Sequence, residues 1–115
     1  MTDECIFCRI IRGESPAQIV YQDDQVTVFR DIAPKTPIHL LIVPNRHIES
    51  LNQLESADAE LMGNLCLTAA RLAAEQGISE SGYRLVINNG RDGGESVPHL
   101  HCHILGGRPM TWPPG

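Results

Sequence analysis

The stretch His99-Leu100-His101-Cys102-His103-Ile104-Leu105 alternates histidine with apolar residues near the end of the chain. In an extended strand, side chains two residues apart point to the same face of the sheet. A strand here would place the three imidazoles in one row, about 7 Å apart, with the apolar side chains on the opposite face. In a helix the three rings would diverge around the axis. We therefore predict a strand that presents three potential nucleophiles, proton carriers or metal ligands, rather than a polar face that happens to be rich in histidine.

The composition is that of a single globular domain. The chain has 115 residues, of which 42% are hydrophobic, and a formal net charge of −5. This balance offers no basic surface for nucleic acid or for anionic membranes, and no apolar run approaches the roughly 18 residues of a membrane span. The acidic start Met1-Thr2-Asp3-Glu4 does not resemble a signal peptide. We expect a cytoplasmic protein with no nucleic-acid or membrane partner, in which the cysteines are reduced: Cys5, Cys8, Cys66 and Cys102.

The hydrophobic pattern predicts an α+β domain with a mainly antiparallel sheet and helix packed on one face. Apolar spacing favours a short helix over residues 5–12 and a long one from a Ser56 cap to Gly77. Strands are expected at residues 19–21, 26–30, 38–43 and 83–88, ahead of the histidine strand. The long helix also carries apolar side chains beyond one stripe, such as Met62 and Leu67, which favours self-association.

A glycine-rich loop, residues 88–98, leads directly into the histidine stretch. Its glycines allow backbone N–H groups to approach an anion closely, and Ser96 adds a hydroxyl donor. We expect no helix to follow the loop, so it is neither a Walker motif nor a dinucleotide fingerprint. An anion-binding loop beside nucleophilic imidazoles points to phosphorus chemistry. His39 in the strand 38–43 can add a fourth imidazole if the two strands are neighbours.

Together, His39, the histidine row and the Gly-Gly-Glu-Ser-Val lead-in at 93–97 resemble the histidine triad family of nucleotide hydrolases and transferases. Ser96 and the closing segment 106–115, Gly-Gly-Arg-Pro-Met-Thr-Trp-Pro-Pro-Gly, resemble the nucleoside phosphoramidase branch of that family. The similarity runs from Ile6 to the last residue. It implies one histidine triad domain over residues 1–115, with a five-stranded antiparallel sheet, one long and one short helix, and a two-fold homodimer.

The resemblance also implies a reaction, the hydrolysis of purine nucleoside phosphoramidates to a nucleoside monophosphate and an amine. His101 would be the nucleophile that forms a covalent nucleotidyl-histidine, and His99 would order the row. His39 and His103 would contact phosphate oxygens, while Ser96 would lie near the leaving amine. The remaining nucleotide contacts implied by the family are the ribose acid Asp31, the base pocket of Ile6, Phe7, Phe29 and Ile32, the oxygen-binding groups of Asn88, Gly94 and Val97, and Trp112 in the C-terminal segment. Ile10 and Leu41 match the same pocket and could equally be core.

The pair Cys5-x-x-Cys8 would place two thiolates on one face of the first helix, which is half of a zinc site. Some bacterial members of the family complete such a pair with two histidines, and His47 and His99 match those positions. The resemblance thus implies a possible structural zinc ion, while catalysis needs no cofactor.

Three alternatives remain open at the level of sequence. Dinucleoside polyphosphate hydrolases of the family carry glutamine at the position of Ser96, which makes their substrates the second choice. A purine nucleotide sensor without turnover would keep the pocket and lose the chemistry. A catalytic metal centre built on the H-x-H-x-H pattern is the third, although no acidic ligand flanks the row. Two departures from the family pattern, Asn89 and Pro98, affect substrate preference and remove no catalytic group.

Overall fold

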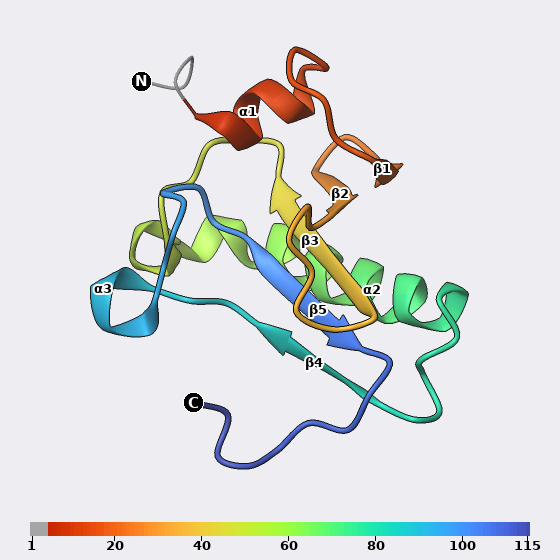
Figure 1. Ribbon diagram of the computed structural model, residues 1–115. Helices are drawn as coiled ribbons and strands as arrows, with labels where there is room; N and C mark the ends of the chain where they lie inside the picture. Colours follow the sequence, from red (N-terminus) through yellow and green to blue (C-terminus); the bar gives the residue numbers. More distant parts are fainter. Residues whose placement is uncertain (1–4) are drawn as a thin grey trace.

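A computed structural model describes residues 5–115, and Met1–Glu4 lie outside the described residues. Five antiparallel strands form one sheet in the order β1-β2-β3-β5-β4, as the α+β prediction required (Figure 1). The elements in chain order are α1 (Ile6–Ile11), β1 (Ile19–Gln22), β2 (Val26–Arg30), β3 (Ile38–Pro44), α2 (Ala59–Glu75), β4 (Tyr83–Val86), α3 (Gly90–Gly93) and β5 (Cys102–Gly106). Among residues 5–115, no helix has the length and apolar character that crossing a bilayer requires.

The central strand β3 separates two apolar clusters because its side chains alternate between the faces of the sheet. Leu40 and Ile42 belong to the larger cluster, which α2 covers from behind the sheet in Figure 1. Leu41 and Val43 belong to the smaller cluster under α1, together with Phe7. His39 lies two residues before Leu41 and therefore points to the α1 face, where the sheet is only partly covered.

Helix α2 confirms the predicted apolar stripe, but it begins later than expected. Residues Ser56–Asp58 form a 3-10 turn, and α2 starts at Ala59. Glu55, not Ser56, begins the turn: its side chain accepts from the backbone of Asp58, while Asp58 accepts from the Glu55 N–H at 2.9 Å. The stripe lies against the sheet and is buried at Leu61, Leu65, Ala69, Leu72 and Ala73.

The predicted three-histidine strand is wrong in its extent, because β5 begins only at Cys102. His99 and His101 precede it in irregular backbone. The register explains this: the ladder between β3 and β5 starts at the pair Ile42–Cys102, and Pro44 two residues later has no N–H to extend it. The chain instead turns away, since the N–H of Leu100 donates to the carbonyl of Ile48 at 2.7 Å.

The glycine-rich segment also differs from the prediction, which had no helix there. Strand β4 ends at Val86, and α3 forms a single helical turn. The N–H of Gly90 donates to the Glu95 carboxylate at 2.9 Å, which closes the segment on itself. Gly94 ends the turn with φ +78°, a left-handed conformation that favours glycine. The chain then passes through Ser96 and Val97 to the histidines.

Candidate active site and metal-binding cluster

A cavity of about 440 Å³ opens between α1 and the α1-facing side of the sheet. Phe7, Phe29, Leu41 and Val97 make its walls mainly apolar, and His101 and His103 form part of its lining. Its volume falls within the range of small-molecule sites, about 300–1,000 Å³. The cavity can therefore take a flat apolar ring system with the two imidazoles at one side.

The backbone fixes the proton of His101. Its Nδ1 lies 2.7 Å from the carbonyl oxygen of His99, and a carbonyl can only accept. Nδ1 therefore carries the hydrogen, and in the neutral ring Nε2 keeps its lone pair. His101 is buried, with 3% of the residue exposed, and the edge contact with Phe7, 5.2 Å between ring centroids, holds the ring in place. The result is an oriented imidazole whose unprotonated nitrogen is the one left for chemistry.

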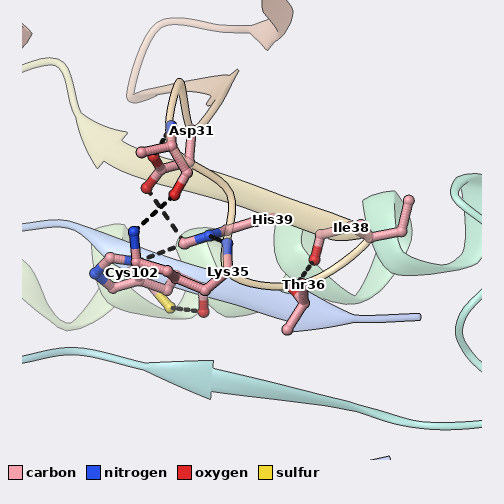
Figure 2. A network of polar contacts seen from close by, with 8 residues as sticks. Asp31, Lys35, Thr36, Ile38, His39 and Cys102 are labelled. Atoms are coloured by element: carbon pink, nitrogen blue, oxygen red, sulfur yellow. Dashed lines mark hydrogen bonds and ion pairs between the residues drawn. The ribbon is translucent and has the colours of Figure 1, made fainter. Parts of the chain in front are cut away.

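His39 forms a hydrogen-bonded chain with its neighbours, of which Figure 2 shows the contacts to Asp31 and Lys35. The backbone N–H of Lys35 donates to His39 Nδ1 at 3.0 Å. The proton of the neutral His39 ring is therefore on Nε2, which lies 2.9 Å from His103 Nδ1 and 3.3 Å from Asp31 Oδ2. With its Nδ1 accepting this bond, the neutral His103 ring carries its own proton on Nε2.

Both rings of this pair stay neutral near neutral pH. Burial lowers the pKa of His103 to about 4, and the neighbouring His101 and His39 add to the effect. Burial also lowers the pKa of His39, although the Asp31 carboxylate opposes that shift. His103 is therefore a neutral hydrogen-bond donor beside His101 rather than a cation.

Asp31 has two roles in the geometry. One carboxylate oxygen accepts from the N–H of Ala33 at 2.8 Å and so caps the loop after β2. The other oxygen faces His39 Nε2, and the side chain also lines the cavity. A group bound in the cavity can thus reach the same carboxylate that contacts His39.

A second cluster brings together the four residues expected to bind metal: Cys5, Cys8, His47 and His99. Each offers one ligand atom, and these four atoms all lie within 4.8 Å of one another. Cys5 is the N-cap residue of α1, so one helical turn brings Cys8 to the same side. His47 follows the end of β3, and His99 precedes β5, so the cluster joins α1 to the sheet.

The donor set and spacing fit a tetrahedral zinc ion. Zn–S bonds of about 2.3 Å and Zn–N bonds of about 2.0–2.1 Å place a sulfur and a nitrogen ligand about 3.5 Å apart. The Nδ1 atom of His99 lies 3.3 Å from Cys5 Sγ and 3.6 Å from Cys8 Sγ, and His47 Nδ1 lies 3.3 Å from Cys8 Sγ. His99 Nε2 donates to the carbonyl of Pro44 at 2.8 Å, which leaves Nδ1 unprotonated for a metal.

His99 therefore faces away from the row in which it was expected. Its ring packs on His47, 4.9 Å between centroids, and it orders His101 through its backbone carbonyl instead of its imidazole. The prediction that all three rings lie in one row is therefore wrong. His101 and His103 lie at the cavity, and His99 lies in the cysteine cluster.

Comparison with known proteins agrees with this geometry. The HIT domain family model matches residues 12–110. The chain belongs to the histidine triad (HIT) family. The purine nucleoside phosphoramidase of Escherichia coli K12 is 49% identical over 110 residues, which cover 96% of this chain and 92% of that protein.

Solved HIT structures share the fold over almost the whole chain. A HIT family hydrolase from Legionella pneumophila superposes with a TM-score of 0.96 at 50% identity, covering 97% of this chain and 100% of the other. A zinc-bound HIT family protein from Mycobacterium smegmatis gives a TM-score of 0.80 at 29% identity, covering 94% of this chain and 78% of the other.

The predicted nucleotide contacts divide into two groups in this HIT protein. Most of them line the cavity: Ile6, Phe7, Phe29, Asp31, Ile32, Ser96, Val97, His101 and His103. Asn88 and Gly94 are not among its lining residues, and they lie on either side of α3 in the chain. Trp112 also lies elsewhere: it is 82% exposed, and its ring packs against the Arg84 guanidinium of β4.

His39 also lies outside the lining, one ring behind His103, whereas direct phosphate contact was expected. Sequence reasoning missed the segment Ser15–Ala17 after α1, which completes the cavity wall. Its residues carry no chemical signature, and only the turn at Gly13 hints that the chain folds back there.

Proposed function

We propose that this HIT protein hydrolyses purine nucleoside phosphoramidates to a nucleoside monophosphate and an amine. The observation that carries the proposal is the fixed tautomer of His101, which leaves Nε2 unprotonated beside a cavity of nucleoside size. The identity of 49% with a purine nucleoside phosphoramidase supports the same substrate class. We place the reaction in the cytoplasm, a reducing compartment in which Cys5 and Cys8 stay free thiols.

The proposed reaction has two displacements at phosphorus. In the first, the Nε2 lone pair of His101 forms a bond to the α-phosphorus, the P–N bond breaks, and the amine leaves with its electron pair and takes up a proton. In the second, a water oxygen attacks the phosphorus of the nucleotidyl-histidine and releases a proton to solvent. The P–Nε2 bond breaks with its electron pair returning to Nε2, and the monophosphate is released. The His99 carbonyl holds the Nδ1 proton throughout and stabilises the positive charge on the ring.

Other cavity residues are proposed to assist in defined ways. The neutral His103 donates from Nε2 to a phosphate oxygen, and His39 keeps it in that tautomer from behind. Ser96 lies on the path of the amine, and its hydroxyl passes a proton to the departing nitrogen while it takes one up from solvent water. Asp31 accepts from the ribose hydroxyls. The apolar walls around Phe7 and Phe29 hold the base.

A metal-dependent reaction fits the described residues less well. Two groups of described side chains have metal-ligand spacing, and His101 belongs to neither. The second group is Asp31, His39 and His103, in which the hydrogen bond from Lys35 places the His39 proton on the nitrogen that would have to bind the ion.

The test uses a fluorogenic adenosine phosphoramidate with the wild-type protein and His101→Ala. We expect turnover that survives EDTA in the wild type. In the variant we expect a loss of at least about 10⁴-fold in kcat, with retained binding of adenosine monophosphate. Turnover abolished by EDTA in protein that stays folded and still binds adenosine monophosphate would establish a metal-dependent enzyme, and binding without turnover in the absence of chelator would establish a sensor. Faster cleavage of a dinucleoside polyphosphate than of the phosphoramidate would favour the second substrate class.

We also propose that the cysteine cluster holds a structural zinc ion and that the protein is a homodimer. When bound, zinc would complete a closed shell of Cys5, Cys8, His47 and His99, with no position left for catalysis. The dimer is supported by exposed apolar side chains on α2 and on the edge strand β4, Leu67 at 73% and Leu85 at 40%. Light scattering at micromolar concentration tests it, and a monomer would refute it.

A further inference from the structure

A second cavity, of about 360 Å³, lies beside the 440 Å³ cavity that is proposed to hold the nucleoside. The two share three lining residues, Ile6, Ser96 and Val97. The other described residues that line the second cavity have no part in the proposed reaction: Cys5, His47, Glu49 and Pro98. The two hollows are therefore neighbours, and Ser96 is the polar side chain among the described residues that they share.

The position of Ser96 relates the second cavity to the substrate. With the nucleoside in the first cavity, the phosphorus has to lie at His101, and the amine extends away from the nucleoside. Ser96 borders both hollows, so an amine leaving past its hydroxyl enters the second cavity. A small amine would leave this space unfilled, whereas a long amine would reach Glu49.

Glu49 determines the charge of this second cavity. Ile6, Ser96, Val97 and Pro98 are uncharged. Cys5 and His47 belong to the metal-binding cluster, in which two thiolates would balance a divalent ion. Among the lining residues that the structure describes, the exposed Glu49 carboxylate is thus the net charge left. The nearest basic residue in sequence, Arg46, does not line the second cavity. It lines a neighbouring hollow that shares His47 and Glu49 with it, and its charge is paired with Asp58.

We propose that the second cavity is the leaving-group subsite and that Glu49 makes it prefer amines that carry an additional positive charge. This inference rests on the proposed phosphoramidase function. Glu49 is a specificity-determining residue in this account and contacts only the distal part of the amine. Its carboxylate attracts a distal ammonium group and repels a distal carboxylate.

The test compares three adenosine 5′-phosphoramidates whose amines differ only in the group at the far end of a hexyl chain: methyl, ammonium or carboxylate. Each is assayed with the wild type, with Glu49→Gln, and with Glu80→Gln as a matched control. Glu80 is exposed and lines neither cavity, and its replacement changes the net charge equally. Unsubstituted adenosine 5′-phosphoramidate reports the basal reaction.

For the wild type and Glu80→Gln, we expect kcat/KM to rise about threefold with the ammonium tail and to fall about threefold with the carboxylate tail at low ionic strength. Added salt should reduce both effects, and Glu49→Gln should remove them while the unsubstituted substrate reacts as before. Equal rates for the three tails, or an unchanged preference in Glu49→Gln, would overturn the subsite while the proposed function stands. Failure to turn over the unsubstituted substrate would instead refute the proposed function, and the subsite with it.

Discussion

His39 Nε2 and His103 Nδ1 lie 2.9 Å apart, across the two central strands of the sheet. His39 is paired in register with Leu105, so His103 is its diagonal neighbour on the same face. The bond continues a chain of donors from the backbone N–H of Lys35, through His39, to the Nε2 proton of His103 at the cavity. The backbone N–H of Lys35 thus sets, through His39, the tautomer of His103, the ring that is proposed to contact the substrate.

Replacing His39 tests whether this donor chain matters for catalysis. His39→Leu removes the donor to His103 Nδ1 and leaves the Lys35 N–H without its acceptor. We expect kcat to fall by about 10²-fold, with a loss of about 1–3 kcal/mol in the free energy of unfolding. His39→Gln is the matched control, because its side-chain amide can donate from nearly the same position as Nε2. It should recover most of kcat, whereas equal rates for the two variants would contradict the donor role.

Acid should destabilise the fold well before its carboxylates titrate. The folded-state pKa of His103, about 4, lies below the ordinary histidine value of about 6.5, so the unfolded chain takes up the proton first as the pH falls. The contribution of His103 to stability is complete above about pH 6.5 and is lost as the pH falls to about 4. His39 and His99 shift in the same direction because of burial.

Urea unfolding at a series of pH values between 7 and 4 measures this effect. The free energy of unfolding should decrease steadily over that interval in the wild type. His103→Gln, which has no titrating ring, should lose less stability over the same interval than the wild type loses. Parallel curves for the two proteins would show that His103 titrates normally in the folded state.

The sequence was sufficient for the sheet, the two main helices, the four members of the cysteine cluster and most of the residues that line the first cavity. Periodicity located β3 and α2 because each buries a continuous apolar stripe, and such stripes are local in sequence. The extent of β5 was not predictable in this way. The alternation of residues 99–105 suits a strand throughout, but strand pairing depends on Pro44, which lies 55 residues away and cannot donate. The role of Glu49 was missed for a similar reason, since only the folded chain brings it beside Ser96.

The cysteine cluster predicts a metal-dependent stability that is separate from activity. Protein purified without chelator should contain about one zinc ion per chain by elemental analysis, and Cys5→Ser/Cys8→Ser should contain none. The double variant should also unfold at a lower temperature, because the link between α1 and the sheet is lost. Cys66→Ser is the control, since Cys66 is exposed on α2 and lies outside the cluster. Absence of zinc from the wild-type protein would refute the assignment.

The position of Asp31 predicts that binding of the ribose affects the hydrogen-bonded pair His39 and His103. Its carboxylate lines the cavity and lies 3.3 Å from His39 Nε2, so hydroxyl groups that donate to it act on the same group that contacts His39. The wild type should therefore prefer an adenosine phosphoramidate over its 2′,3′-dideoxy analogue by roughly 10- to 100-fold in kcat/KM, the value of a hydrogen bond to a charged group. Asp31→Asn keeps the shape of the side chain and the loop cap but removes the charge. This variant should show a much smaller preference for the adenosine substrate over its dideoxy analogue. If Asp31→Asn slowed both substrates by the same factor, the carboxylate would serve His39 alone and the ribose would be bound elsewhere.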